Sequence, residues 1–102
     1  VHAEVIGRSG DRGVDVLATN IHGEYELIQC KRYRQGNNIG STPIQRVHSY
    51  MRTRNASRAW VITTSDFTPE GRDEARITNV TIMNGHDLLQ SLEIYYPGRF
   101  CL

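Results

Sequence analysis

The chain has 102 residues, a length that suits one domain with a single hydrophobic core and leaves no room for a second folded unit. Its hydrophobic content of 38% and charged content of 23% are ordinary for a globular domain, and no apolar run is long enough to span a bilayer. No signal-peptide pattern opens the sequence, so we expect a cytoplasmic protein. Cys30 and Cys101 are too few for a disulfide framework or a structural zinc site.

Positive charge is concentrated in one part of the sequence. Between Leu27 and Ser65 there are seven basic residues and no acidic one, whereas the rest of the chain has five arginines and eleven acidic residues. The two parts therefore carry formal charges of +7 and −6, although the net charge is only +1. Such a basic stretch is expected of a protein that binds nucleic acid, because contacts of Arg and Lys with phosphates dominate the affinity for nucleic acid. A solvated helix face with ordinary counterions is the alternative.

The first half of the chain predicts three strands. Weak alternation over residues 1–6 indicates a strand, and the glycine-rich stretch 7–13 indicates a turn. Residues 14–19 and 25–33 predict two further strands, which are joined by a short turn and most simply form an antiparallel hairpin. The polar, glycine-containing stretch 34–41 predicts a mobile loop.

Helices and strands alternate in the second half. Thr42 as N-cap, Pro43 at the first helical position and Gln45 in the capping-box place predict a helix that ends near Asn55. The apolar run 59–63 predicts a strand that is covered on both faces in a parallel arrangement. The remaining predicted elements are a helix that starts at Thr68-Pro69 and ends near Ile77, a strand over 80–83 and a helix over 86–92.

Lys31 is the only lysine among twelve basic residues. A charge that only solubilises can be Lys or Arg, whereas a compact ammonium beside a metal-bound water cannot be replaced by a planar, always protonated guanidinium. Lys31 is therefore the first candidate for chemistry. A codon bias that left one lysine by chance is the alternative.

Strand periodicity predicts that Lys31 shares a face with two other polar groups. Leu27, Gln29 and Lys31 lie on the same face of their strand because side chains alternate. On the neighbouring strand, Asp15 points away from the side taken by its two valine neighbours. If the two strands pair, one carboxylate, one amide oxygen and one ammonium can converge on a single spot.

Such a polar cluster among apolar residues needs a compensating partner, and a divalent cation can supply it. Asp15 and the Gln29 carbonyl oxygen are hard ligands of the kind magnesium takes, with other places filled by water, a main-chain carbonyl and substrate phosphate. Lys31 would orient or help deprotonate the attacking water and offset negative charge at phosphorus. The alternative is a buried Asp15–Lys31 ion pair, with Gln29 hydrogen-bonded to a strand end.

Four blocks of sequence carry a family resemblance by their order and spacing. They are Gly-Asp-Arg-Gly-Val-Asp-Val at 10–16, Ile-Gln-Cys-Lys-Arg-Tyr at 28–33, Val-Ile-Thr-Thr-Ser at 61–65 with Phe-Thr at 67–68, and Asn-Gly-His-Asp-Leu-Leu at 84–89. Together they resemble the Mrr-type (Mrr_cat-like) branch of the PD-(D/E)xK nuclease superfamily. The resemblance implies the restriction endonuclease-like fold, an α/β (α+β) domain with a central mixed sheet flanked by helices. It also implies magnesium-dependent hydrolysis of DNA phosphodiesters.

The resemblance also assigns roles by position. It implies that Asp15 is the metal-binding aspartate, that Gln29 takes a place usually held by glutamate or aspartate, and that Lys31 is the motif lysine. These three would be the catalytic residues. Asp15, Gln29 and the main-chain carbonyl of Cys30 would bind Mg²⁺, for which Mn²⁺ can substitute.

Two further residues match the family pattern in places beside this site. Asp11 matches the first aspartate of the glycine-rich turn, where it would support the metal ligands or hold the loop. Gln45 matches a glutamine in the helix that packs beside the site, although it can equally be the capping partner of Thr42.

The chain departs from the family pattern at two points. Gln29 removes one negative charge from the metal site, so magnesium should bind more weakly and an additional acid is needed. In many relatives that acid comes from a helix before the first strand, whereas this chain begins at the strand. The sequence is then a fragment of a longer protein, or a partner subunit, as in a homodimer, closes that face. Glu4 and His2 share a face of the first strand and could substitute, or could simply be edge-strand charges.

These observations predict a single metal-dependent DNA endonuclease domain over residues 1–102, which would hydrolyse phosphodiester bonds by metal-activated water. The family resemblance implies that cleavage leaves 5′ phosphate and 3′ hydroxyl ends. Target recognition would come from an additional DNA-recognition domain or subunit, or from DNA shape. The alternative is a catalytically lapsed DNA- or junction-binding module of the same fold, and a third interpretation is a small domain that binds an acidic protein. The arginines expected along the phosphate backbone are Arg32, Arg34, Arg46, Arg52 and Arg54.

Overall fold

The computed structural model describes residues 2–8 and 14–95 of the chain. Eight elements follow one another in this part, in the order of strands and helices that the sequence predicts. Their bounds are β1 His2–Arg8, β2 Val14–Thr19, β3 Tyr25–Lys31, α1 Ser41–Thr53, β4 Arg58–Thr63, α2 Pro69–Thr78, β5 Thr81–Met83 and α3 Gly85–Tyr95.

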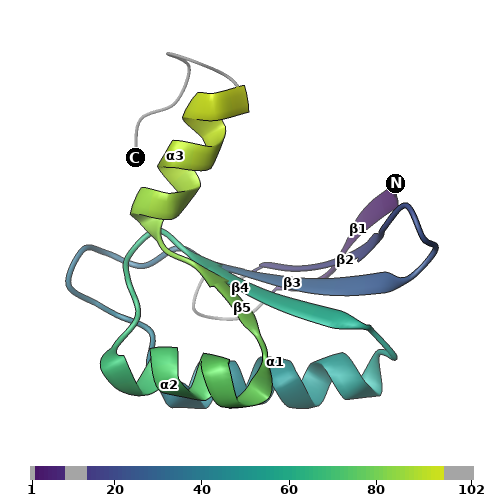
Figure 1. Cartoon of the computed structure of the whole chain (residues 1–102), viewed down its shortest axis with the longest axis horizontal. Coiled ribbons are helices and arrows are strands. Elements are labelled where there is room, and N and C mark those ends of the chain that lie inside the picture. Colours follow the sequence, from purple (N-terminus) through teal and green to yellow (C-terminus); the bar gives the residue numbers. More distant parts are fainter. Residues whose placement is uncertain (1, 9–13, 96–102) are drawn as a thin grey trace.

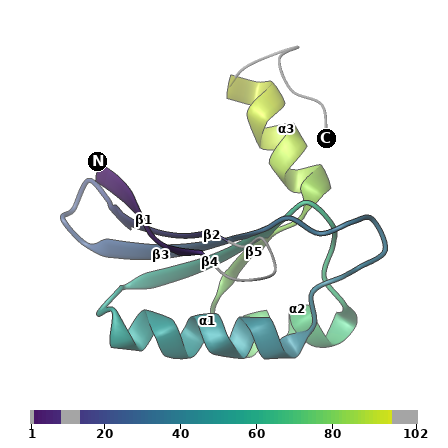
Figure 2. The ribbon, with the colours of Figure 1, turned by 180° about the vertical axis from the view of Figure 1, so that it is seen from behind.

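The five strands form one mixed sheet with the spatial order β1-β2-β3-β4-β5. The first three strands pair antiparallel, and β4 and β5 continue the sheet parallel to β3. The predicted hairpin of β2 and β3 and the predicted parallel setting of β4 are both confirmed. Parallel neighbours need crossover connections, and α1 and α2 provide them. These two helices lie side by side against one face of the sheet, whereas α3 rises on the opposite side (Figures 1 and 2).

The hydrophobic core lies between the sheet and the layer formed by α1 and α2. Leu27 of β3 and Val61 of β4 pack with Ile44 and Val47 of α1, and each of the four is at most 2% exposed. Burial of side chains of this size contributes about 1.5–3 kcal/mol each. The other face of β4, which carries Trp60, is only partly covered. The prediction that β4 is covered on both faces is therefore correct for the helix face alone.

The starts of α1 and α2 test the capping predictions. Thr68 caps α2 as expected, because its hydroxyl accepts a hydrogen bond from the Gly71 backbone N–H at 3.0 Å. For α1 the prediction is wrong, since the helix begins at Ser41 and its N-cap is Gly40, which has no side chain to cap with. Thr42 lies inside the first turn.

The connection between β3 and α1 is less mobile than its polar composition suggests. β3 ends at Lys31 rather than at Tyr33, and the chain then runs without regular structure to α1. Ile39 anchors this connection, since it is 1% exposed and its backbone N–H donates to the Asp66 carbonyl at 2.9 Å. The prediction of a mobile loop over 34–41 is therefore wrong at its C-terminal end.

The helix layer covers only part of the sheet. α1 packs on β3 and β4 and α2 packs on β5, whereas within residues 2–8 and 14–95 no helix lies against β1 or β2. The border of the helix layer therefore runs along β3. In the same part of the chain no helix is long and apolar enough to cross a membrane.

Candidate active site

Asp15 and Gln29 face each other across the antiparallel pair of β2 and β3. They are direct register partners, and the Gln29 side-chain amide donates a hydrogen bond to Asp15 Oδ1 at 2.9 Å. Leu17 and Leu27 form the next pair on the same face, and Leu27 belongs to the core under α1. Asp15 and Gln29 therefore lie on the helix face of the sheet, half-buried at the border of the helix layer.

Lys31 lies on the same face as this pair. It is two residues after Gln29 in β3, and it pairs in parallel register with Thr63 of β4, which is buried in the helix-facing layer. Lys31 is only 9% exposed, and its ammonium lies over the ring of Tyr33 with Nζ 6.0 Å from the ring centroid. The carboxylate, the amide and the ammonium thus occupy one face near the C-terminal end of β3.

The alternative interpretation of this cluster is wrong in the role that it gives to Gln29. It pairs Asp15 with Lys31 and leaves Gln29 bonded to a strand end, whereas the Gln29 amide donates to Asp15. The carboxylate is therefore satisfied at least in part by a neutral group. Ion pairs elsewhere in the described residues join Arg72 to Asp66 and Arg76 to Asp73, and both pairs lie at the surface.

The donor set fits a hard divalent cation that keeps most of its water. Asp15 offers a carboxylate and Gln29 an amide, and oxygen donors of this kind suit Mg²⁺ or Mn²⁺ rather than zinc, which prefers nitrogen and sulfur. No group of three or more His, Cys, Asp or Glu side chains within 2–8 and 14–95 is arranged to hold a metal. A cation bound to Asp15 would therefore take its other ligands from the Gln29 amide, a main-chain carbonyl, water and phosphate oxygens.

Cys30 lies between the two polar residues of β3, with its side chain on the opposite face. It pairs with Val14 on one side and Ile62 on the other. Burial raises the pKa of the Cys30 thiol, and the negative charge of Asp15 raises it further. A raised pKa keeps the thiol largely protonated at neutral pH, so Cys30 is a poor nucleophile there.

The predicted positions beside the site have different outcomes. Gln45 donates from Nε2 to Glu74 Oε1 at 3.1 Å, and this contact directs it toward α2. The interpretation of Gln45 as the capping partner of Thr42 is wrong, because the α1 N-cap is Gly40. Asp11 lies outside the described residues. Glu4 is exposed in β1 and pairs with Leu17, one position along the face from Asp15.

The five predicted DNA-contacting arginines are all exposed, but they do not form one continuous track. Arg32 and Arg34 follow Lys31 directly, whereas Arg52 and Arg54 lie at the far end of α1. Arg46 lies between the two ends, and a helical rise of about 1.5 Å per residue puts it about 12 Å along the axis from Arg54.

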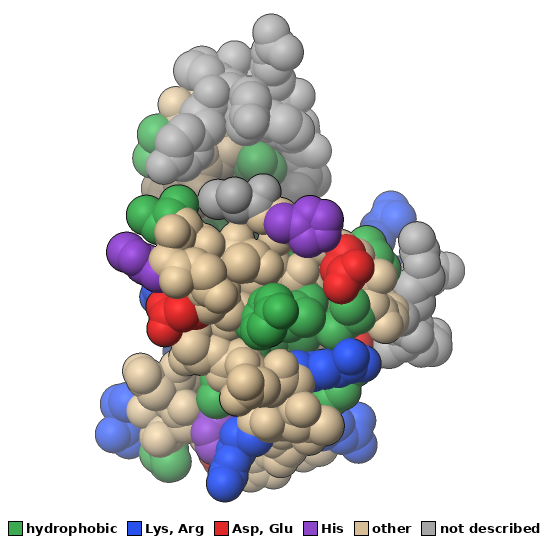
Figure 3. Space-filling model, turned by 90° about the vertical axis from the view of Figure 1, so that its right-hand side faces the viewer, with side chains coloured by type: hydrophobic (Ala, Val, Ile, Leu, Met, Phe, Trp, Pro, Cys, Tyr) green, Lys and Arg blue, Asp and Glu red, His purple; other side chains and the backbone are tan. Residues whose placement is uncertain are grey.

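Arg54 also has an intramolecular partner. Its guanidinium stacks on the Tyr50 ring at 5.0 Å and donates to the Tyr50 hydroxyl. Figure 3 looks at the right-hand end of the molecule in Figure 1, and its basic side chains gather mostly in the half where α1 and α2 lie.

Sequence reasoning missed the role of the segment that follows β4. The backbone N–H of Thr64 donates to the Lys31 carbonyl at 3.1 Å, and the Thr64 hydroxyl bonds to both backbone polar groups of Tyr33. The hydroxyls of Thr63 and Ser65 bond to each other at 3.0 Å and are buried. In the sequence alone, the Thr-Thr-Ser block is only part of a family pattern. Its contact with β3, the strand that carries Lys31, depends on the parallel register of β3 and β4.

Asp66 joins the third and fourth sequence blocks. Its Oδ1 accepts hydrogen bonds from the Asn84 side chain at 3.0 Å, the Phe67 backbone at 2.8 Å and Arg72 at 2.6 Å. The bond from Asn84 is the largest of the effects that lower the pKa of the Asp66 carboxyl. The ends of β4 and β5 are thereby tied together beside the site.

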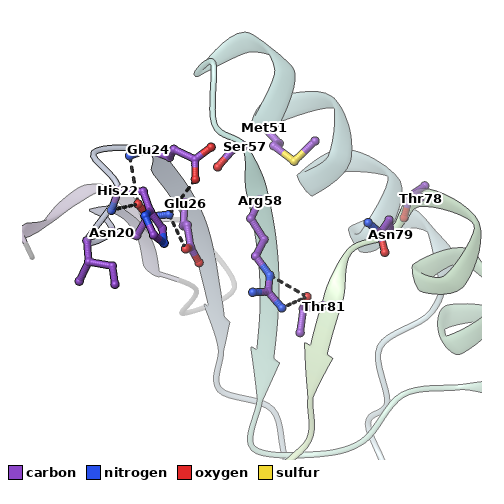
Figure 4. Close-up of a pocket in the computed structure, with 11 residues that line it drawn as sticks. Asn20, His22, Glu24, Glu26, Met51, Ser57, Arg58, Thr78, Asn79 and Thr81 are labelled. Atoms are coloured by element: carbon purple, nitrogen blue, oxygen red, sulfur yellow. Dashed lines mark hydrogen bonds between the residues drawn. The ribbon is translucent and has the colours of Figure 1, made fainter.

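A separate pocket lies at the other end of the sheet, between the β2–β3 turn and the start of β4 (Figure 4). Several of its polar side chains are bonded to one another or to neighbouring residues. Asn20 donates to Glu26 at 3.0 Å, the bonds from Asn20 and Trp60 lower the pKa of Glu26, and Arg58 donates to Thr81. Glu26 is five strand residues from Lys31, about 17 Å along β3. These hydrogen bonds help to hold the β2–β3 hairpin in place, and the pocket is not part of the candidate active site.

The fold and the polar face together define a class of protein. The chain forms a mixed five-stranded sheet with α1 and α2 on one face and α3 on the other. Asp15, Gln29 and Lys31 lie at one end of two adjacent strands. This is the restriction endonuclease-like fold. The solved structure of the DNA modification-dependent restriction endonuclease AspBHI is similar to this chain, with a TM-score of 0.64 and 13% sequence identity. The similarity covers 91% of this chain and 26% of AspBHI, so this chain spans about a quarter of that protein's length.

The sequence comparison names the family. The family model Mrr_cat, described as restriction endonuclease, matches residues 1–92. The chain therefore belongs to the Mrr-type restriction endonuclease family, as the four sequence blocks indicate. The search of curated proteins finds no match.

Proposed function

We propose that this chain is a catalytic domain that hydrolyses DNA phosphodiester bonds with the help of a divalent cation, Mg²⁺ or Mn²⁺. The observation that carries the proposal is that Asp15, Gln29 and Lys31 share the helix face of β2 and β3, with the pair Asp15–Gln29 in direct hydrogen-bond contact. Three polar side chains together on a strand face that is otherwise largely apolar are unusual, and clusters of this kind often mark a site of chemistry or ligand binding.

Each residue has a distinct part in this proposal. Asp15 and the Gln29 amide oxygen would hold the cation, with the Cys30 main-chain carbonyl as a third ligand. A bound divalent cation supplies activation of water and neutralises charge on the phosphoryl group. Lys31 would orient the attacking water through its ammonium and stabilise the negative charge that develops on the phosphoryl oxygens. The water oxygen would bond to phosphorus as the bond from phosphorus to the 3′ oxygen breaks, and the 3′ oxygen would take up a proton from solvent and leave as a 3′ hydroxyl.

The exposed basic residues would hold the DNA without reading its sequence. Arg32 and Arg34 are exposed and follow Lys31 closely in the chain, and they would contact the phosphates that flank the scissile bond. The small share of AspBHI that this domain matches supports a second domain or subunit for target recognition. We also propose that the uncovered face of β1 and β2 receives a further acidic group, from another segment or from a second copy in a homodimer.

Incubation of the protein with supercoiled plasmid and Mg²⁺ or Mn²⁺ tests the proposal. Nicking is expected with either cation and should disappear in EDTA. Lys31→Ala should slow nicking by at least about a hundredfold, while its DNA affinity measured in Ca²⁺ changes little. Arg76→Ala is the matched control, since Arg76 is exposed on α2 and paired with Asp73.

One observation favours the binding-only alternative: Gln29 offers a neutral amide, which holds a divalent cation less strongly than a carboxylate would. DNA binding without nicking by the unmutated protein, at any concentration of Mn²⁺, would support a lapsed module. Weak binding that does not fall with added salt would instead support a protein partner.

A further inference from the structure

Lys31 contacts an aromatic ring that follows it in the chain. Its Nζ lies 6.0 Å from the centroid of the half-buried Tyr33 ring, at the outer limit of a cation–π contact. The four-carbon stem of lysine has many rotamers, and an ammonium that acts on one water must occupy few of them. A ring face that attracts the ammonium restricts the positions it can take.

The backbone that carries this ring is held by a side chain rather than by the sheet. The regular pairing of β3 ends at Lys31. Beyond that point the Thr64 hydroxyl accepts a hydrogen bond from the Tyr33 N–H at 2.9 Å and donates one to the Tyr33 carbonyl at 2.7 Å. The Thr64 N–H also donates to the Lys31 carbonyl at 3.1 Å. One residue of the neighbouring strand end therefore fixes both Lys31 and Tyr33.

Thr64 is in turn fixed from the other side by the start of α3. A Cβ placed on Gly85 would lie 2.3 Å from the Thr64 carbonyl oxygen, so only glycine allows this approach. The Gly85 N–H donates to the Ser65 carbonyl at 3.0 Å. The contacts thus run from α3 through the end of β4 to the lysine strand.

We propose that Tyr33 is a positioning residue for Lys31, and that Thr64 holds Tyr33 in place through its hydroxyl. The proposal rests on the proposed function, in which Lys31 acts in DNA cleavage. It goes beyond that function because it adds two groups to the site of Asp15, Gln29 and Lys31, namely the Tyr33 ring and the Thr64 hydroxyl.

The single lysine makes the contact directly observable. In protein labelled with ¹³C,¹⁵N-lysine, the side-chain methylene and ammonium signals come from Lys31 alone. The ring current of Tyr33 should displace these signals upfield from their positions in the unfolded chain. Tyr33→Phe should keep the displacement because the ring remains, whereas Tyr33→Leu should abolish it. Thr64→Val should reduce it, and Thr64→Ser, which keeps the hydroxyl, should restore it.

The second measurement is the rate of cleavage in a single turnover with protein in excess over DNA. Tyr33→Leu and Thr64→Val should each slow cleavage by about three- to tenfold. Their DNA affinity in Ca²⁺ should stay within about twofold, because neither residue is expected to contact phosphate. Tyr33→Phe and Thr64→Ser should cleave at nearly the rate of the unmutated protein.

The two measurements separate the possible failures. If the unmutated protein does not cleave DNA, the proposed function fails, and the lysine signals still decide whether the ring holds the ammonium. If it cleaves, an unchanged lysine spectrum or an unchanged rate in Tyr33→Leu overturns the positioning role. Should circular dichroism show that Tyr33→Leu does not fold, the matched pair Thr64→Val and Thr64→Ser decides by the same two measurements.

Discussion

Gln29 donates its side-chain amide to Asp15 Oδ1 at 2.9 Å, directly across the pair of β2 and β3. The amide satisfies the carboxylate without adding a second negative charge. The site is therefore stable without a cation, but it attracts a cation less strongly than two carboxylates would. This single contact accounts for both the stability of the polar face and its expected weak affinity for Mg²⁺.

Gln29→Glu should reverse this balance. Two carboxylates would then face each other without the hydrogen bond, so the midpoint of thermal unfolding in EDTA should fall by roughly 4–8 °C for a destabilisation of about 1 kcal/mol. Added Mn²⁺ should raise the midpoint more in the variant than in the unmutated protein, because a site with two carboxylates binds the cation more tightly. Gln90→Glu, at an exposed position of α3, is the control for the added charge. An equal response to Mn²⁺ in both proteins would contradict cation binding at Asp15.

The two groups of arginines should contribute differently to cleavage. Two double variants test this, one with Ala at Arg32 and Arg34 and one with Ala at Arg52 and Arg54. Each should weaken DNA binding and make affinity less dependent on salt. The slope of log affinity against log salt should become less negative by about 0.9 for each phosphate that is no longer neutralised. Only the first pair should also slow cleavage at saturating protein, because only Arg32 and Arg34 adjoin Lys31. Filter binding at several salt concentrations and single-turnover cleavage measure the two effects. Equal slowing by both pairs would show that the DNA lies along the whole of α1.

Stability at acid pH should depend on Asp66. Its pKa is lowered by the hydrogen bond from Asn84, then by those from Phe67 and Arg72. A carboxylate with a lowered folded pKa stabilises the fold above its ordinary value of 3.8 and loses that contribution as the pH falls below it. We therefore expect the free energy of unfolding, measured with urea, to fall less between about pH 5 and pH 3 in Asp66→Asn than in the unmutated protein. Parallel curves for the two proteins would disprove the role of this carboxylate.

Cys30 should report on the charge at Asp15 from the opposite face of β3. Because the charge of Asp15 is the second cause of the raised thiol pKa, its removal should lower that pKa and speed alkylation at about pH 8. Asp15→Asn should therefore react with iodoacetamide faster than the unmutated protein, in a Cys101→Ser background where Cys30 is the only cysteine. Mg²⁺ should accelerate alkylation when Asp15 is present and have no effect in Asp15→Asn. Acceleration of both proteins by Mg²⁺ would place the cation elsewhere.

Local patterns were sufficient for most of the elements. Residues 14–19 predict β2 with both ends correct, and Thr68 predicts the start of α2, because each prediction depends on neighbouring residues only. Thr42 failed as a cap because the helix begins one residue earlier, at Ser41, directly after the connection that Ile39 anchors in the core. Ile39 failed as part of a mobile loop because its partner, Asp66, is distant in the sequence.

The order of residue types along two strands was enough to propose that Asp15, Gln29 and Lys31 share a face, since side chains of a strand alternate by backbone geometry alone. Which groups touch was decided by the fold. The bond between Asp15 and Gln29 depends on the register of β2 with β3, and the hold of Thr64 on Tyr33 depends on the register of β3 with β4. The basic residues, which lie in one stretch of the sequence, are spread out in the fold, because α1 carries Arg52 and Arg54 away from Lys31. Register and helix direction are set by burial of the whole core, and no short pattern of residues contains that information.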